Sequence, residues 1–310
     1  MVLTEADSVE QRPTETPPLD VSVVIVNYKV RDLLRDCLAS LAHDIGDGPA
    51  QLRGEVWVVD NASGDGSVEM MAAEFPQVKV IASTWNRGYG AANNLAIRQA
   101  TGRYLLILNP DTKLPPRAII DTIAEMERHP DIGALGPKLI RADGTLDRAC
   151  RRSFPSPEVA FYRLFGLARL FPNHPRFAAY NLLNVDEDTA LDVDSVCGAY
   201  MLLRREVVER VGMFDEAFRM YGEDLDWAYR IKQAGWRVRY HPAVTVLHLK
   251  GQSSRQRPVS SIRAFYDAMR VFYDKHYAQE HARPFNLLIH TGIGLFEVAA
   301  LVRNRLKPSR

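Results

Sequence analysis

The chain has 310 residues, of which 46% are hydrophobic and 25% are charged, so it can bury a full core and is longer than one average domain. Its formal net charge of +1 excludes whole-molecule attraction to nucleic acid, and we expect no nucleic-acid partner. From Lys250 onward, eleven Lys/Arg against four Asp/Glu give +7, which leaves 1 − 7 = −6 for the rest. The three cysteines, Cys37, Cys150 and Cys197, form no C-x-x-C pair, which favours a reducing cytoplasm and excludes a disulfide framework.

Residues 1–18 are polar and rich in Pro and Thr, without an apolar stretch. This composition predicts a disordered leader and no secretory signal. The first strand, over 21–28, is a nearly continuous β-branched run, as expected for a strand covered on both faces. A helix over 31–42 follows, with its leucines on one face.

The same alternation continues along the chain. We predict strands over 55–61, 78–83, 104–109 and 132–139, and helices over 67–75, 89–100 and 116–128. Gly102 is placed to end the helix over 89–100. Further on, we predict a strand over 193–203, a helix over 223–234 and a strand over 238–249.

Strands separated by helix-length crossovers predict an α/β fold with a Rossmann-like, mostly parallel central sheet and flanking helices, whose ligands bind beyond the strand C-termini. The pattern breaks over 141–191, which we interpret as an insertion near an acceptor site. Residues 19–255 then form the catalytic domain, and 256–310 a C-terminal helical extension.

Polar residues end three of the early strands. They are Asn27 and Tyr28, Asp60 and Asn61, and Asn109 followed by Asp111. Asx residues often end strands for structural reasons alone. Their presence at one edge of a sheet nevertheless fits a nucleotide site, in which Asp60 accepts hydrogen bonds from a base or ribose. Asp111, delivered by an apolar strand, is suited to bind Mg²⁺ or Mn²⁺ beside a diphosphate.

A second group of acids, Glu223, Asp224 and Asp226, opens the helix predicted over 223–234. The dipole of the helix N-terminus explains part of this cluster. Asp224, however, lies on the same face as the apolar stripe that includes Trp227, where an acid is unusual without a task. We interpret it as an ionised general base. His248, after the last strand, is either structural or a metal ligand.

Taken together, the motifs resemble those of the inverting family 2 glycosyltransferases, which have the GT-A fold, and particularly their bacterial rhamnosyltransferase-like branch. The matching stretches are VSVVIVNY, WVVDNASGDGS, NRGYGAANNLAI, LLILNPD, CGAYMLLRREV, FDE, YGEDLDWAYR and HLKGQSS, in the family's order from Val21 to Ser254. The resemblance implies that Asp60 binds the nucleoside, that Asp111 and His248 bind a divalent metal, and that Asp224, with Glu223, forms the catalytic acid pair. It also implies a donor pocket lined by Asn86, Arg87, Gly88 and Asn93. The first acid of the family's D-x-D element is Asn109 here, which removes one negative charge from the metal site.

The implied activity is transfer of a sugar, rhamnose as the leading choice, from a dTDP- or UDP-linked donor to a glycan or lipid-linked acceptor in cell-envelope polysaccharide synthesis. The residues leave two alternatives. Asn109 gives some weight to a nucleotide-sugar-binding or membrane scaffold protein with impaired turnover. Gly88 to Asn93 approaches G-x-G-x-x-G, but its third glycine is missing, and an NAD-dependent oxidoreductase leaves Gly222 to Trp227 without a role.

On the acceptor side, Arg151 and Arg152 are candidates to grip an anionic acceptor, unless they belong to a solvated basic loop. Gly198, Asp226 and Trp227 complete the predicted acceptor site. The segment 285–302 is mostly apolar but contains polar residues, which favours an interfacial helix or a packing or dimerisation helix over a membrane span. Arg303, Arg305, Lys307 and Arg310 follow it, so we expect a cytoplasmic protein that docks peripherally on the inner face of the membrane, or a homodimer formed through these helices.

Overall fold

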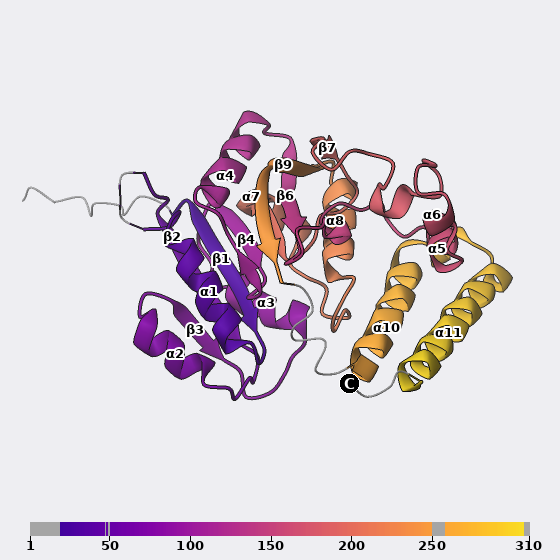
Figure 1. Cartoon of the computed structure of the whole chain (residues 1–310), viewed down its shortest axis with the longest axis horizontal. Coiled ribbons are helices and arrows are strands. Elements are labelled where there is room, and N and C mark those ends of the chain that lie inside the picture. The colour runs from indigo at the N-terminus through magenta and orange to yellow at the C-terminus, as the bar shows by residue number, and fades with distance from the viewer. Residues whose placement is uncertain (1–18, 47, 49, 250–257, 307–310) are drawn as a thin grey trace, which may run out of the picture.

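The computed structural model describes residues 19–46, 48, 50–249 and 258–306. The predicted leader, the end of the HLKGQSS stretch, and Lys307 and Arg310 lie outside these residues. The described chain forms a mixed α/β structure around one sheet, with a helical hairpin at the C-terminal end (Figure 1).

The sheet has nine strands in the order β3-β2-β1-β4-β8-β6-β9-β5, with β7 paired to β9. Strands β1 (Val21–Asn27), β2 (Gly54–Asp60), β3 (Lys79–Ala82) and β4 (Tyr104–Leu108) are mutually parallel. Strand β8 (Tyr200–Arg204) runs antiparallel to both β4 and β6 (Ile132–Ile140). Strand β6 is parallel to β9 (Arg237–His248), which pairs antiparallel with β5 (Thr112–Lys113). The predicted mostly parallel sheet is confirmed.

Helices flank this sheet. They are α1 (Arg31–Leu41), α2 (Ser67–Glu74), α3 (Tyr89–Ile97), α4 (Ala118–Arg128), α7 (Arg205–Val211) and α8 (Glu223–Gln233). Every residue of β1 and of β4 is buried. Since successive side chains of a strand point to opposite faces, both faces of the central strands are covered. This explains why these strands are apolar throughout rather than alternating.

Three local predictions differ from the structure. Helix α3 ends at Ile97, with Arg98 as its C-cap, so Gly102 does not end it. Gly102 instead meets β1, where a Cβ would lie 2.4 Å from the backbone nitrogen of Ser22. The strand predicted over 193–203 is divided into β7 (Leu191–Asp192) and β8, with an irregular stretch between them. Neither α7 nor β5 was predicted.

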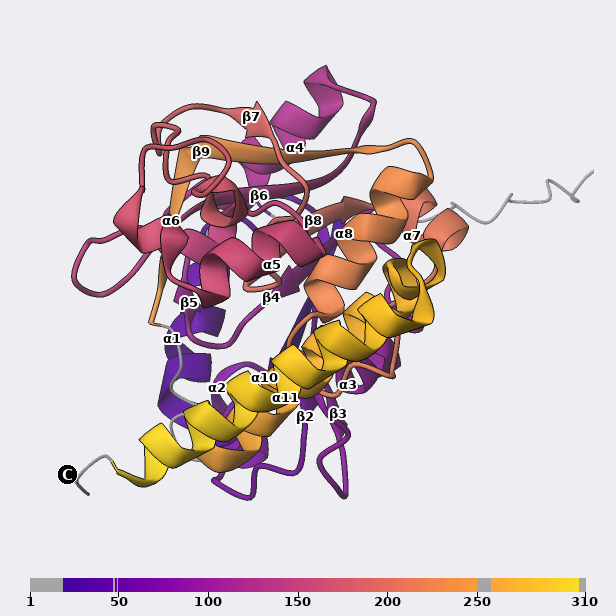
Figure 2. The same ribbon diagram turned by 90° about the vertical axis from the view of Figure 1, so that its right-hand side faces the viewer.

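The segment predicted as an insertion contains α5 (Pro157–Leu164), α6 (Leu167–Leu170) and two short 3-10 helices, η1 (Arg148–Cys150) and η2 (Ala179–Asn181). The C-terminal hairpin consists of α10 (Pro258–His276) and α11 (Arg283–Arg305). In Figure 2, α11 lies in front of α10, with α5 above them. Helix α10 packs on the rest of the protein through a small core of Phe218, Leu225, Ala268 and Phe272.

Candidate active site

At the end of β1 and β2, a buried hydrogen-bond network fixes Asp60. Asn27 Nδ2 donates to Asp60 Oδ1 at 2.9 Å and lies 3.1 Å from Ser63 Oγ and 2.9 Å from Ser67 Oγ. The backbone N–H of Ser63 donates to Asp60 Oδ2 at 3.1 Å. Because β1 and β2 are parallel with Asn27 opposite Asp60, both side chains leave the sheet at one edge. Asn27 is fully buried, so its role here is to orient Asp60. The side chain of Tyr28, beside it, is half-buried.

The loop before α3 is held to this edge by Asn61. The backbone N–H of Arg87 donates to Asn61 Oδ1 at 2.9 Å, and Asn61 Nδ2 donates to the Gly88 carbonyl at 3.2 Å. Asn86 Oδ1 accepts from the Gly88 N–H at 3.1 Å. Gly88 has a φ of 85°, and a Cβ there would lie 2.5 Å from the Arg219 carbonyl oxygen. The loop therefore packs directly against the segment that leads into α8.

Tyr89 connects this donor-side edge to the acid pair. Its hydroxyl donates to Asn109 Oδ1 at 2.9 Å and lies 3.1 Å from the Gly198 carbonyl oxygen. The backbone N–H of Gly198 in turn donates to Asp224 Oδ2 at 3.0 Å. Strand β8 brings Gly198 close to Asn109, because β8 runs antiparallel to β4 and therefore starts beside the end of β4. There the Asn109 N–H donates to the Ala199 carbonyl at 3.0 Å. Sequence analysis did not single out Tyr89, although it lies in a matching stretch.

The two acids at the start of α8 have different surroundings. Asp224 Oδ2 accepts from Arg152 Nη2 at 2.6 Å, and Oδ1 accepts from the Leu225 N–H at 2.8 Å. Glu223 Oε2 is buried without a hydrogen-bond partner among the described residues. Burial, reinforced by the negative charge of Asp224, raises the pKa of Glu223 to about 8. At neutral pH Glu223 is therefore protonated, beside the ion pair that Asp224 forms with Arg152.

On the other side of the D-x-D element, Asp111 meets His248. Thr112 of β5 pairs with His248 of β9, which places Asp111, the residue before Thr112, next to His248. His248 Nε2 lies 3.4 Å from Asp111 Oδ1. The other ring nitrogen, Nδ1, lies 3.0 Å from Asp147 Oδ2. Burial lowers the pKa of His248, but the hydrogen bonds to Asp111 and Asp147 outweigh burial and raise it to about 9. Asp147 was not predicted, and nothing in the sequence of the insertion distinguishes it from neighbouring acids.

Four residues of the predicted acceptor site are buried and contact other parts of the protein. Arg151 is buried and donates to the Asp186 and Val185 carbonyls at 2.7 and 2.6 Å, so it holds the insertion together rather than facing an acceptor. Arg152 contacts Asp224 in place of the predicted acceptor. Trp227 is fully buried in the main core, and Asp226, also fully buried, pairs with residues of α8 and α10: Arg230, Lys275 and His276.

Asn93, predicted to line the donor pocket, is also fully buried. Its Nδ2 donates to the Tyr89 carbonyl at 3.0 Å, and its Oδ1 has no hydrogen-bond partner among the described residues. Asn93 therefore supports Tyr89 from within α3. The other predicted donor residues, namely Asp60, Asn61, Asn86, Arg87, Gly88, Asn109 and Asp111, lie along the edge formed by the strand ends.

A mostly parallel sheet whose polar strand ends lie near a helix-borne acid pair is the arrangement of a GT-A glycosyltransferase. The comparisons agree with this class. The glycosyl transferase family 2 model matches residues 22–212, and the chain belongs to this family.

Among curated proteins, the chain is 28% identical to an N-acetylglucosaminyl-diphospho-decaprenol L-rhamnosyltransferase of Mycobacterium tuberculosis (strain ATCC 25618 / H37Rv), over 93% of this chain and 94% of that protein. It is 27% identical to the rhamnosyltransferase WbbL of Escherichia coli (strain K12), over 54% of this chain and 63% of that protein. The chain is thus a rhamnosyltransferase-like glycosyltransferase.

Solved structures share the fold. The mannosyltransferase PcManGT from Pyrobaculum calidifontis, in complex with GDP-Man and Mn²⁺, matches with a TM-score of 0.55 at 20% identity, over 97% of this chain and 80% of that one. GalNAc-T7 with UDP, GalNAc and Mn²⁺ matches with a TM-score of 0.56 at 17% identity, over 82% of this chain and 48% of that one, so this chain spans about half its length.

Proposed function

We propose that this protein is an inverting rhamnosyltransferase that moves rhamnose from a dTDP-linked donor to a lipid-linked glycan acceptor. One observation carries the proposal: hydrogen bonds from Asn109 through Tyr89 and Gly198 connect the donor-side edge to Asp224. An acceptor hydroxyl beside Asp224 is then near a donor held at the strand ends, which gives the proximity that a single displacement needs.

In the proposed reaction, Asp224 takes the proton of the acceptor hydroxyl. The acceptor oxygen forms a bond to the anomeric carbon while the bond from that carbon to the diphosphate oxygen breaks, and the electron pair leaves with the nucleotide diphosphate. Attack from the face opposite the leaving group inverts the configuration. Arg152 stabilises the ionised form of Asp224, and the protonated Glu223 keeps a second negative charge out of the site.

The residues around Asp111 fit a divalent cation. Within the described part of the chain, no three His, Cys, Asp or Glu side chains form a group able to hold a metal ion. However, Mg²⁺ and similar ions at diphosphates use only one or two protein ligands, with phosphate oxygens and water as the rest. Asp111 Oδ1 and His248 Nε2 would supply two, once the ring gives up its Nε2 proton to the cation, and Asp147, on Nδ1, fixes the ring orientation as carboxylates behind histidine ligands do. A cation there would act as a Lewis acid on the departing diphosphate.

The donor and acceptor are inferred from relatives. The mycobacterial relative's name specifies an L-rhamnosyltransferase acting on N-acetylglucosaminyl-diphospho-decaprenol, and its match covers nearly the whole of both chains. We therefore propose a polyprenyl glycosyl diphosphate of the decaprenyl type as acceptor, and a cytoplasmic location at the inner face of the membrane. The alternative, a binding protein with impaired turnover, rests on Asn109 in place of the first acid of D-x-D.

Transfer measured with a panel of nucleotide sugars, with manganese and after chelation, tests the proposal. We expect dTDP-rhamnose to be used and chelation to lower the rate. In Asp224→Asn, donor affinity should remain, while kcat falls ~100-fold to ~10,000-fold because the general base is lost. Wild-type turnover in Asp224→Asn would reject the assigned base. Donor binding without transfer in the wild-type protein would favour the binding-protein alternative.

A further inference from the structure

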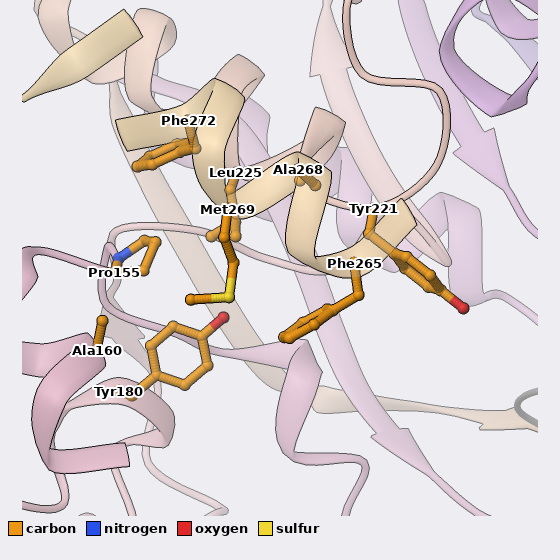
Figure 3. A pocket seen from close by; sticks show the side chains of 10 residues that line it. Pro155, Ala160, Tyr180, Tyr221, Leu225, Phe265, Ala268, Met269 and Phe272 are labelled. Carbon is orange, nitrogen blue, oxygen red and sulfur yellow. The ribbon is translucent and has the colours of Figure 1, made fainter. Parts of the chain in front are cut away.

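An apolar pocket lies between the start of α8, helix α10 and the insertion (Figure 3). Gly222 and Leu225, which flank Glu223 and Asp224 in the chain, form one wall. Helix α10 forms a second wall, which includes Ala268 and Met269. The insertion forms the third with Ala160 and Tyr180, and Figure 3 shows Met269 extended toward the Tyr180 ring.

The pocket is elongated along α10. The residues of α10 that line it recur at positions 265, 268, 269 and 272, the spacing of a single helical face. From position 265 to position 272 the helix rises ~10 Å, at 1.5 Å per residue. None of the lining side chains carries a charge, and none belongs to the hydrogen-bonded network at the strand ends. The pocket therefore suits a narrow, flexible hydrocarbon, and not a second sugar or a nucleotide.

The two elements that form the outer walls also carry exposed apolar side chains. Phe161, in α5, and Phe165, which directly follows α5, are 49% and 60% exposed. The ring of Phe165 meets that of Phe296 of α11, with 5.5 Å between centroids. Apolar side chains thus connect the insertion with the hairpin that contains α10, and these two segments also line the pocket.

We propose that this pocket binds the first isoprenoid units of the acceptor's polyprenyl chain. This inference rests on the proposed function, because a hydroxyl that reaches Asp224 on a short glycosyl diphosphate headgroup brings its lipid to the neighbouring wall. Methionine and aromatic side chains adapt to a branched hydrocarbon, and the apolar surface beyond the pocket is where the rest of the chain returns to the bilayer. The pocket selects acceptors by their lipid as well as by their sugar.

The proposal is tested by comparing the KM values of two acceptors at a fixed detergent concentration. Both acceptors carry the same glycosyl diphosphate headgroup, and one has a polyprenyl tail while the other has a butyl tail. The wild-type protein should show the lower KM for the polyprenyl acceptor. Ala160→Phe, which fills the pocket, should raise that KM about tenfold, equivalent to ~1.4 kcal/mol, with kcat and the butyl-acceptor KM unchanged. Val259→Phe adds similar bulk at an exposed position of α10 outside the pocket and should leave both KM values unchanged. Equal KM values for the two tails in the wild-type protein, or equal effects of Ala160→Phe on both, would overturn the inference.

A second readout needs no transfer and separates failure of the inference from failure of the proposed function. A polyprenyl diphosphate with a photoreactive group on its first isoprenoid unit should label peptides that contain Tyr180 or Met269. Ala160→Phe should abolish this labelling. Labelling of these peptides in a protein that transfers no sugar would support the pocket and reject the activity. Labelling confined to other peptides would reject the pocket.

Discussion

Arg151 and Arg152 are adjacent in the sequence and received the same prediction, but they have different partners in the structure. Both are buried, but Arg151 binds backbone carbonyls of the insertion, whereas Arg152 binds Asp224 and the Val196 carbonyl. Side chains that follow one another along an extended backbone point in opposite directions, so their partners differ completely. A sequence pattern cannot separate them, because the partner of Arg152 lies 72 positions away.

The pair offers a matched test of whether Arg152 positions Asp224. Arg152→Lys keeps the charge but cannot reach Asp224 and the Val196 carbonyl together. We expect kcat to fall about tenfold with donor KM unchanged, because the general base loses its fixed orientation. Arg151→Lys should lower thermal stability and leave kcat unchanged. If both variants kept the wild-type kcat, Arg152 would be only structural.

Glu223 should make stability depend on pH. Its pKa is raised from 4.5 to about 8 in the folded protein, so between these values the folded state retains a proton that the unfolded state has lost. The contribution of Glu223 to the free energy of unfolding is therefore fully present below about pH 4.5 and declines as the pH rises to about 8. Glu223→Gln should nearly match the wild-type free energy of unfolding at pH 5 and exceed it at pH 8.5 by on the order of 4 kcal/mol. Denaturant unfolding at the two pH values measures this, and an equal difference at both would contradict the shifted pKa.

At the scale of elements, periodicity predicted the strands and helices of the β-α alternation to within a few residues. It did not predict that β8 runs antiparallel, because strand direction depends on pairing and not on local pattern. Nor did it predict the break before β8, in which Gly198 lies. These two features bring Gly198 between Tyr89 and Asp224. The strand-end residues of the site could thus be predicted, and the connection between its two halves could not.

Helix α8 shows the same limit in the three acids of its first turn. Glu223 is buried and protonated, Asp224 pairs with the insertion, and Asp226 pairs with the end of α10. Burial alone would raise the pKa of Asp226, but hydrogen bonds from His276 and Lys275 hold it at about 2. The helix dipole favours all three acids equally, so only tertiary partners distinguish a base from an anchor for the C-terminal hairpin.

For the molecule as a whole, the proposed docking on a membrane depends on α11. The helix is long and apolar enough by length and composition to cross a membrane. Its polar side chains, however, bond to α10: Asn286 with Tyr273 at 2.6 Å, and His290 with Asp274 at 2.8 Å. The remaining face exposes leucines and valines and ends near Arg303 and Arg305. A helix with one face hydrogen-bonded to the protein and the other face apolar is suited to lie in the membrane–water interface.

Flotation with anionic liposomes tests this orientation. Leu288 and Leu295 are 65% and 67% exposed and lie seven residues apart on one face of α11. The double variant Leu288→Asp/Leu295→Asp should lose liposome binding, because it places two charges where acyl chains would be, while transfer to a water-soluble acceptor continues. Arg303→Gln/Arg305→Gln should weaken binding less, by ~1 kcal/mol per residue, and make it less sensitive to salt. Val80→Asp, at an exposed position on the edge strand β3, is the matched control and should bind like the wild-type protein. If the leucine variant floated normally but changed from dimer to monomer by light scattering, the apolar face of α11 would be a dimer interface and not a membrane surface.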